Sequence, residues 1–247
     1  MKLYGLLGYP LSHSFSKDYF TRKFQNAEYK DCAYQNFELQ SLFDIKNYLN
    51  SFEGLKGFNI TIPYKEQILN YLDRSDKLVE SINACNCISV IENEWIGYNT
   101  DVIGFELSFK GFLKPNHTKA LILGTGGASK AVAYVCRKLG LEFLFISKSK
   151  KGEGYLSYEA LNEDILQEYQ VIINTTPVGS YPANSACPDI PYQFITSQHY
   201  LFDLIYNPEK TEFLMKGQVQ GAQIRNGYEM LVIQAEESWK IWNTNYL

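Results

Sequence analysis

A glycine-rich loop between an apolar strand and a helix constrains the fold of this chain more than any other feature. The loop reads Gly124-Thr125-Gly126-Gly127-Ala128, directly after the apolar run 120–123 and at the start of a helix expected over residues 127–139. Glycine lets backbone amides approach a pyrophosphate, and the helix N-terminus adds partial positive charge there. This order of elements predicts a Rossmann-type dinucleotide-binding domain, the alternative being an ordinary glycine-rich turn.

Strands and helices are expected to alternate on both sides of this loop, which is typical of parallel sheets covered by helices. Strands are expected at 3–8, 32–37, 56–62, 84–91, 95–97, 120–123, 141–147, 171–174, 200–205 and 222–225, and helices at 13–26, 40–50, 64–71, 75–81, 101–111, 127–139 and 227–243. We predict an α/β protein with an N-terminal, mostly parallel α/β substrate-binding domain over 1–100 and a C-terminal Rossmann-type dinucleotide-binding domain over 101–225. A C-terminal helix within 226–247 is expected to pack back on the first domain.

Composition excludes several classes of function. The formal net charge is −4 and the charges are scattered, which argues against nucleic-acid binding. The sequence contains no apolar run of about 18 residues and does not begin like a signal peptide, so we expect a cytoplasmic protein with no membrane partner. The five cysteines do not form a disulfide framework, and the three histidines lack metal-ligand spacing, so no metal is expected.

The segment Phe58-Asn59-Ile60-Thr61-Ile62-Pro63-Tyr64-Lys65 places a lysine just beyond an expected strand. Side chains alternate across a strand, so Asn59 and Thr61 are expected to line a pocket while Phe58, Ile60 and Ile62, on the other face, are buried. Pro63 cannot donate a ladder hydrogen bond and is expected to end the strand there.

Lys65 and Asp101 form a candidate catalytic pair. When hydride reaches a carbonyl carbon, negative charge builds on the oxygen, and a cation that can give up a proton lowers the barrier. Lys65 can supply both effects, and a carboxylate at Asp101, beside the domain junction, could orient the amine. The alternative is that Lys65 caps a surface turn and that Asp101 caps a helix.

The second strand of the cofactor domain ends at Ser147-Lys148-Ser149, where an NAD-binding protein usually places an acid for the ribose 2′-hydroxyl. No acid is present at this point, and hydroxyls followed by lysines suit a 2′-phosphate, so NADP is favoured over NAD. The alternative is that these lysines form a solvated turn.

Serines cluster after the first strand, in Ser12-His13-Ser14-Phe15-Ser16. Serines at a helix N-terminus can bind a carboxylate through their hydroxyls and backbone amides, although simple capping of the helix would use the same residues.

Taken together, these segments resemble the shikimate dehydrogenase family nearly from end to end. The matching segments, in order, are Ser12-His13-Ser14, Asn59 to Lys65, Ala84-Cys85-Asn86, Asn99-Thr100-Asp101, Gly124 to Ala128, Asn174-Thr175-Thr176-Pro177, Tyr206-Asn207-Pro208 and Gly227-Tyr228-Glu229-Met230-Leu231 with Gln234. The resemblance implies reversible NADPH-dependent reduction of 3-dehydroshikimate to shikimate, in aromatic amino-acid (chorismate) biosynthesis.

The resemblance also implies a role for each group of residues. Ser12, Ser14 and Tyr206 would hold the ring carboxylate; Asn59, Thr61, Asn86 and Gln234 would contact the ring hydroxyls; Lys65 and Asp101 would be catalytic. The cofactor-binding set would be Gly124, Thr125, Gly126, Gly127, Ala128, Ser147, Lys148, Ser149, Thr175 and Gly227.

Two departures from the family pattern leave alternatives open. Ser147-Lys148-Ser149 replaces the usual Asn-Arg-Thr, and Asn83-Ala84-Cys85-Asn86-Cys87 replaces the usual Gly-Ala-Val-Asn-Thr. The alternatives are a quinate/shikimate dehydrogenase that uses NAD, a non-catalytic metabolite-sensing relative, and a structural or interaction protein. The assembly is expected to be a monomer or a homodimer.

Overall fold

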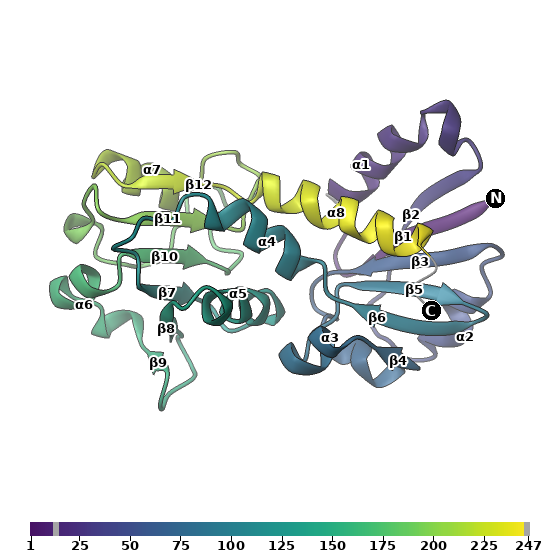
Figure 1. The fold of residues 1–247 in the computed structure, drawn as a ribbon, viewed down its shortest axis with the longest axis horizontal. Coiled ribbons are helices and arrows are strands. Elements are labelled where there is room, and N and C mark those ends of the chain that lie inside the picture. The colour runs from purple at the N-terminus through teal and green to yellow at the C-terminus, as the bar shows by residue number, and fades with distance from the viewer. Residues whose placement is uncertain (12–14, 245–247) are drawn as a thin grey trace. The chain divides into compact units, whose positions relative to one another are not determined.

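The computed structural model describes residues 1–11 and 15–244, and the chain divides into two compact units (Figure 1). The first unit contains Met1–Thr100 together with the chain from Gln234 onward, and the second contains Asp101–Ile233. The chain therefore passes between the units twice. The second passage lies inside one continuous helix, α8 (Tyr228–Asn243).

The first unit is built on a mixed sheet of six strands in the order β2-β1-β3-β5-β6-β4. Strand β1 pairs in parallel with β2 and β3, whereas β3–β5 and β5–β6 are antiparallel. The strands are β1 (Lys2–Gly8), β2 (Cys32–Glu38), β3 (Leu55–Ile60), β4 (Arg74–Ser75), β5 (Cys87–Ile91) and β6 (Glu94–Tyr98). The helices are α1 (Phe15–Phe24), α2 (Ile45–Asn50) and α3 (Lys77–Ile82), with 3₁₀ turns η1 (Ala27–Tyr29) and η2 (Gln67–Tyr71).

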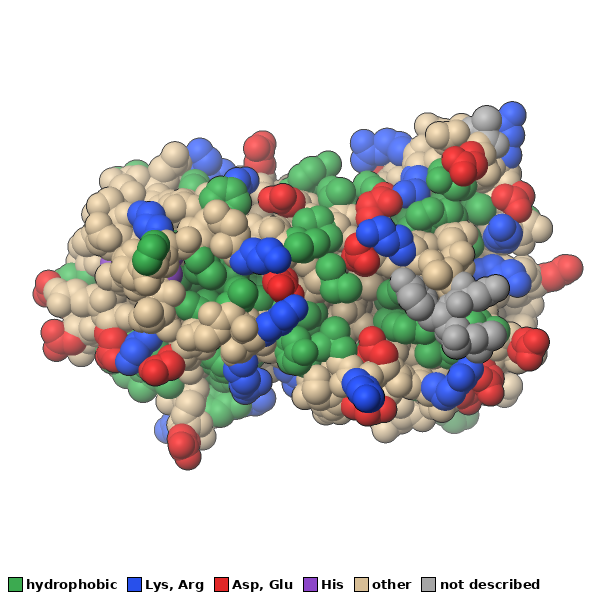
Figure 2. Space-filling model, viewed as in Figure 1, with side chains coloured by type: hydrophobic (Ala, Val, Ile, Leu, Met, Phe, Trp, Pro, Cys, Tyr) green, Lys and Arg blue, Asp and Glu red, His purple; other side chains and the backbone are tan. Residues whose placement is uncertain are grey.

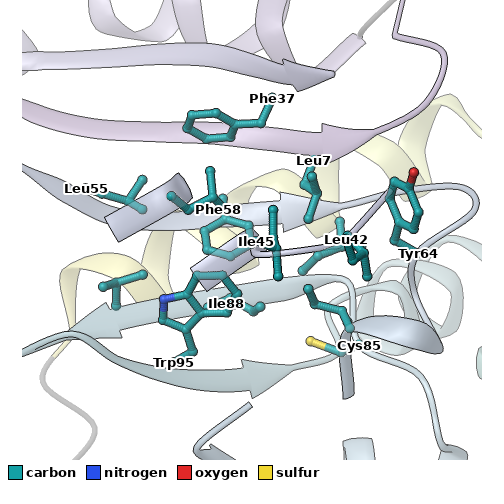
Figure 3. Close-up of a cluster of buried hydrophobic side chains, with 14 of the residues drawn as sticks. Leu7, Phe37, Leu42, Ile45, Leu55, Phe58, Tyr64, Cys85, Ile88 and Trp95 are labelled. Carbon is teal, nitrogen blue, oxygen red and sulfur yellow. The ribbon is translucent and has the colours of Figure 1, made fainter. Parts of the chain in front are cut away.

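One face of this sheet carries an aliphatic and aromatic core (Figure 3). Phe58 and Trp95 lie at its centre with ring centroids 5.0 Å apart, and Ile45 from α2 closes it. Alternation along β3 explains this placement, because Phe58 and Ile60 point to the same face of the sheet.

The opposite face is covered by aromatic side chains of α1 and α8. Trp242 stacks on Tyr4 at 4.9 Å between centroids, and its indole nitrogen donates to the Ile88 carbonyl at 2.9 Å. Gly57 leaves room for this ring, since a Cβ there would lie 2.3 Å from the Trp242 indole. Large aromatic side chains dominate the burial of apolar area, so α8 is an integral part of the first unit's core.

The second unit contains an all-parallel sheet of six strands in the order β12-β11-β10-β7-β8-β9. The strands are β7 (Lys119–Leu123), β8 (Glu142–Ile146), β9 (Tyr155–Leu156), β10 (Val171–Asn174), β11 (Tyr200–Asp203) and β12 (Gln223–Arg225). The helices are α4 (Asp101–Lys110), α5 (Gly127–Lys138), α6 (Glu163–Glu168) and α7 (Glu212–Val219), with 3₁₀ turns η3 (Tyr158–Ala160) and η4 (Tyr192–Phe194). Parallel strands joined through helices are the Rossmann-type arrangement.

Several local expectations are wrong. Strand β3 ends at Ile60 rather than 62, and Ile62, expected to be buried, is 64% exposed because the chain turns beyond Thr61. Strand β5 begins at Cys87, so Asn86 precedes it instead of lying within it. Residues 67–71 form a 3₁₀ turn where an α-helix was expected.

Candidate active site

A buried polar cluster lies in the first unit, next to the points where the chain leaves that unit and returns to it. We call it the junction cluster; its members are Asn59, Asn86, Thr100, Gln234 and Ser238, and none is more than 5% exposed. Buried amides and hydroxyls are costly to desolvate unless they are hydrogen-bonded, and these side chains bond to one another.

Asn59 is held on three sides. Its oxygen accepts from the Tyr34 hydroxyl at 3.1 Å, and its amide nitrogen donates to Ser238 Oγ at 2.8 Å and to the Asn86 carbonyl at 3.3 Å. Both amide hydrogens are thus committed within the protein, which leaves one oxygen lone pair for another partner.

Asn86 and Thr100 bind each other through side chain and backbone. Asn86 Oδ1 accepts from the Thr100 backbone amide at 2.7 Å, and Asn86 Nδ2 donates to Thr100 Oγ1 at 3.0 Å. Thr100 is the last residue before Asp101, which begins α4 and is 5% exposed. The amide of Asn86 therefore fixes the backbone directly before the predicted catalytic carboxylate.

Thr61 and Lys65 follow β3 in a turn, and both are half-buried. The Thr61 backbone amide donates to the Leu7 carbonyl at 2.9 Å, and the Lys65 carbonyl accepts from the Cys85 amide at 2.8 Å. These bonds attach the turn to β1 and to the segment that carries Asn86. The first unit thus supports Asn59, Thr61, Lys65, Asn86 and Gln234 on one connected framework.

Ser12 and Ser14 lie outside the described residues.

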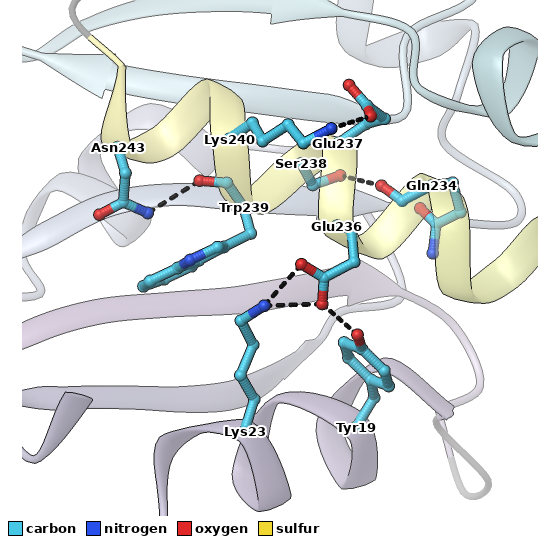
Figure 4. Close-up of polar contacts among 9 residues, drawn as sticks. All are labelled: Tyr19, Lys23, Gln234, Glu236, Glu237, Ser238, Trp239, Lys240 and Asn243. Atoms are coloured by element: carbon cyan, nitrogen blue, oxygen red, sulfur yellow. Dashed lines mark hydrogen bonds and ion pairs between the residues drawn. The ribbon is translucent and has the colours of Figure 1, made fainter. Parts of the chain in front are cut away.

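Helix α1, which starts at Phe15, is anchored to α8 by a charged contact (Figure 4). Lys23 Nζ donates to both oxygens of Glu236 at 2.6 Å, and the Tyr19 hydroxyl also donates to this carboxylate. Burial opposes ionisation of Glu236, but the hydrogen bonds from Lys23 and Tyr19 outweigh it and lower the pKa of this carboxyl group.

The glycine loop lies in the second unit, between β7 and α5. Gly124 has φ of +105°, and a Cβ there would lie 2.9 Å from Thr175 Oγ1, so this position requires glycine. Gly126 precedes the first turn of α5 and has open space where a Cβ would stand. Exposed backbone at a helix N-terminus fits a pyrophosphate, so these residues fit a dinucleotide cofactor.

Thr175 closes the other side of this loop. Its hydroxyl donates to the Leu123 carbonyl at 2.7 Å, and its backbone amide donates to the same carbonyl at 3.0 Å. The ends of β7 and β10 are thereby joined, as expected where parallel strands present their carboxyl ends to a ligand.

Ser147, Lys148 and Ser149 follow β8. Ser147 is buried, and its hydroxyl accepts from the backbone amides of Ser149 at 3.3 Å and Lys150 at 3.0 Å, so it shapes the turn. Lys148 and Ser149 are exposed. The ammonium of Lys148 is therefore accessible to a phosphate, while Ser147 contributes by ordering the backbone.

A cavity of about 370 Å³ in the second unit is lined by Tyr206, Glu209, Asn226 and Tyr228. Gly227 lies between two of these lining residues in the sequence. The Gly227 amide donates to the Ile205 carbonyl at 3.1 Å, and a Cβ at Gly227 would lie 2.1 Å from the Leu204 carbonyl oxygen. Only glycine permits this close approach between the chain before α8 and the segment that carries Tyr206.

Three buried residues at these sites were not expected to take part from the sequence: Thr100, Ser238 and Asp203. Asp203 ends β11 and accepts hydrogen bonds from Asn174 at 3.0 Å, the Ile205 amide at 3.1 Å and Thr211 at 2.6 Å. Burial raises the pKa of Asp203 to about 7, against the opposing effect of these hydrogen bonds. No pattern in the sequence singled out Asp203, which lies within the strand expected at 200–205.

Among residues 1–11 and 15–244, no group of His, Cys, Asp and Glu side chains is arranged to hold a metal ion. Within the same ranges no helix has the length and apolar character that a membrane span needs. Acidic and basic side chains are interspersed on the face of each unit shown in Figure 2, and that face has no extended basic patch.

Comparison with known proteins shows the family to which this chain belongs. Residues 6–88 match the family model of the shikimate dehydrogenase substrate binding domain. The chain is 38% identical to the shikimate dehydrogenase (NADP(+)) of Methanococcus maripaludis strain C6, with 98% of this chain and 91% of that protein covered.

Solved structures agree over the whole chain. The shikimate dehydrogenase of Aquifex aeolicus superposes with a TM-score of 0.87 at 31% identity, covering 98% of this chain and 92% of that one. The enzyme of Thermus thermophilus, solved in complex with NADP(H) and shikimate, gives 0.85 at 27% identity, covering 98% and 94%. The two sheets, the glycine loop and the full-length similarity lead to one conclusion: the chain belongs to the shikimate dehydrogenase family.

Proposed function

We propose that this protein catalyses the reversible NADPH-dependent reduction of 3-dehydroshikimate to shikimate. The observation that carries the proposal is the similarity to NADP(+)-dependent shikimate dehydrogenases over 98% of the chain. The arrangement of the glycine loop supports it, because Gly124 and Gly126 leave the backbone open at the start of α5.

Lys65 acts on the carbonyl oxygen in this proposal. When bound, NADPH supplies the hydride. The Lys65 ammonium stabilises the negative charge that builds on the oxygen and donates a proton to it; in the reverse direction the amine accepts the hydroxyl proton. The Asp101 carboxylate orients the ammonium, and its position at the first residue of α4 suits that role.

The remaining residues hold the two ligands. Ser12, Ser14 and Tyr206 bind the ring carboxylate, and Thr61, Asn86 and Gln234, with the one uncommitted lone pair of Asn59, bind ring hydroxyls. The pyrophosphate is bound by the glycine loop, residues Gly124, Thr125, Gly126, Gly127 and Ala128. The 2′-phosphate is bound by Lys148 and Ser149, and Ser147 shapes their turn. The nicotinamide is bordered by Thr175 and Gly227.

The organisation of the molecule follows from these roles. The first unit is the substrate-binding domain and the second is the NADP-binding domain, a division supported by the separate sheets. The enzyme works in the cytoplasm as a monomer or homodimer.

Steady-state assays test the proposed function. Shikimate with NADP⁺ should give the highest kcat/KM among four combinations of shikimate or quinate with NADP⁺ or NAD⁺. Equal or better turnover of quinate with NAD⁺ would favour the alternative, a quinate/shikimate dehydrogenase that uses NAD. We consider this alternative because position 148 carries lysine in place of the family's usual arginine. Absence of both turnover and NADPH binding would overturn the proposal.

Replacement of Lys65 by alanine tests the proposed acid and base. We expect kcat for shikimate oxidation to fall by about 10²-fold or more, with KM within several-fold, because the lost interaction acts mainly in the transition state. The matched control is Lys56→Ala, which removes an exposed lysine from β3 and should leave both constants within about two-fold. Wild-type turnover in Lys65→Ala would refute the role.

A further inference from the structure

Ser238 lies in the interior of α8 and is fully buried. Its hydroxyl donates to the Gln234 carbonyl, one turn earlier, at 2.9 Å, as Figure 4 shows. The same oxygen accepts from Asn59 Nδ2 at 2.8 Å and lies 3.2 Å from Thr100 Oγ1. One small hydroxyl thus joins α8, β3 and Thr100, the last residue before the chain first leaves this unit.

These contacts define an ordered chain of donors. Since the single Ser238 proton goes to the Gln234 carbonyl, Thr100 must be the donor in the Thr100–Ser238 bond. The Thr100 oxygen in turn accepts from Asn86 Nδ2. In the order Asn86 to Thr100 to Ser238 to Gln234 each hydroxyl donates one bond; the Thr100 oxygen accepts from Asn86, and the Ser238 oxygen accepts from both Thr100 and Asn59.

The cluster connects the two places where the chain crosses between the units. Thr100 is the last residue of the first unit before the chain leaves it, and Gln234 is the first residue after the chain returns. Ser238 contacts both of them, although Thr100 and Ser238 are 138 positions apart in the sequence.

We propose that Ser238 is a positioning residue whose hydroxyl fixes Thr100, and thereby the start of α4 at Asp101, against helix α8. This inference rests on the proposed function, in which Asp101 orients Lys65 and Gln234 binds substrate.

Loss of the hydroxyl would redirect the Thr100 proton. The nearest other acceptors are Asn86 Oδ1 at 3.3 Å and Gln234 Oε1 at 3.5 Å, both longer than the present bond. The first choice would turn the Thr100 hydroxyl away from α8, and the second would engage the Gln234 side chain that is proposed to hold substrate. Small displacements of catalytic groups are costly because rate depends steeply on their orientation.

Ser238→Ala is the direct test, with Ser108→Ala as its matched control. Ser108 is also a buried helical serine, but among the described residues its hydroxyl bonds to the Gly104 and Phe105 carbonyls of its own helix and to no other element. We expect kcat for shikimate oxidation to fall about 10-fold or more in Ser238→Ala. The Kd for NADPH should stay within about two-fold, and Ser108→Ala should keep kcat within about two-fold.

Thr100→Val removes the same bond from the other side while keeping the side-chain shape. Thr100→Val also removes the bond that Asn86 donates, and Ser238→Ala the bond that Asn59 donates, but the two changes share the Thr100–Ser238 bond. The loss of kcat in the double variant Thr100→Val/Ser238→Ala should therefore be smaller than the product of the two single losses. Fully multiplicative losses, or a Ser238→Ala kcat equal to that of Ser108→Ala, would overturn the proposal.

Hydrogen exchange gives a readout that does not depend on activity. The Thr100 amide, which donates to Asn86 Oδ1, should exchange about 10-fold faster in Ser238→Ala than in Ser108→Ala. Unchanged exchange would overturn the positioning role even if kcat fell. If the wild-type protein did not oxidise shikimate, the proposed function would fail while the exchange rates still decided whether Ser238 fixes Thr100.

Discussion

Asp203 shows how a single buried residue can support two loops of the cofactor domain. Its carboxylate accepts hydrogen bonds from the side chains of Asn174 and Thr211. Asn174 in turn accepts from the amide and hydroxyl of Thr176, and Thr211 caps α7. The backbone amide of Ile205, next to Tyr206, donates to the same carboxylate. The ends of β10 and β11 are therefore held by one side chain.

The pKa of Asp203 makes the stability of this protein depend on pH. Burial raises the pKa from its ordinary value of 3.8 to about 7, so between pH 4 and 7 the folded state retains a proton that the unfolded chain releases. The contribution of Asp203 to the free energy of unfolding must then fall as pH rises through this window, and it becomes constant above pH 7.

Asp203→Asn, which resembles the protonated carboxyl, should remove this slope. From pH 5 to 8 the difference in unfolding free energy, variant minus wild type, should rise by on the order of 2 kcal/mol. Urea unfolding followed by circular dichroism at each pH measures it. The control is Asp189→Asn, which neutralises an exposed acid of the same unit and should leave a parallel curve. Parallel curves for Asp203→Asn and wild type would contradict the assignment.

Residues that carry chemistry were easier to predict from the sequence than the residues that support them. Lys65, Asp101 and the glycines belong to short motifs in which neighbouring residues give the signal. Ser238 gave no such signal, and Thr100 appeared only as a member of the segment Asn99-Thr100-Asp101 with no role of its own, because the bond between the two joins positions far apart in sequence. A serine inside a helix usually bonds to the carbonyl one turn earlier, as Ser238 also does.

At the scale of elements, two glycines of one loop have different reasons to be glycine. Gly124 has a positive φ and packs against Thr175, so its substitution would strain the fold itself. Gly126 has φ of −83°, and apart from its two chain neighbours no described residue comes within 4 Å of the point where a Cβ would stand, so alanine would fit the protein without strain. What Gly126 leaves open is space for a ligand.

Gly126→Ala should therefore weaken cofactor binding without affecting the fold. We expect the Kd for NADPH to rise about 10-fold or more, because the new methyl group occupies the space through which backbone amides reach the pyrophosphate. The melting temperature without ligand should stay within about 2 °C. Gly111→Ala, also in open space in the second unit, is the control. Unchanged NADPH affinity in a fluorescence titration would show that the pyrophosphate does not approach this glycine.

Element boundaries depended on contacts that local patterns do not contain. The strand pattern of alternating residues continues to Ile62, but β3 ends at Ile60 because its pairing with β1 and β5 stops there. Helices α6 and α7 were not expected; they have six and eight residues, and each depends on a polar cap, Asn162 or Thr211. Short helices gain most of their stability from tertiary packing, which periodicity in so few residues does not reveal.

At the scale of the whole molecule, the two units differ in how the chain builds them. The first unit needs both ends of the chain, because Tyr4, Phe20 and Phe24 pack against Trp239 and Trp242 of α8. The second unit is one continuous segment, 101–233, and the described residues of its main core cluster all come from within it.

Separate expression tests whether these units are domains in the sense of independent folding. The fragment 101–233 should fold and bind NADPH with a Kd within about 10-fold of the full chain, because it keeps its parallel sheet, its core and the glycine loop. The fragment 1–100 should not fold, since loss of α8 exposes the aromatic face of its sheet. Joining residues 234–247 to it through a flexible linker should restore folding. Circular dichroism and NADPH fluorescence measure these outcomes, and an unfolded 101–233 fragment would show that the cofactor domain depends on the first unit for its stability.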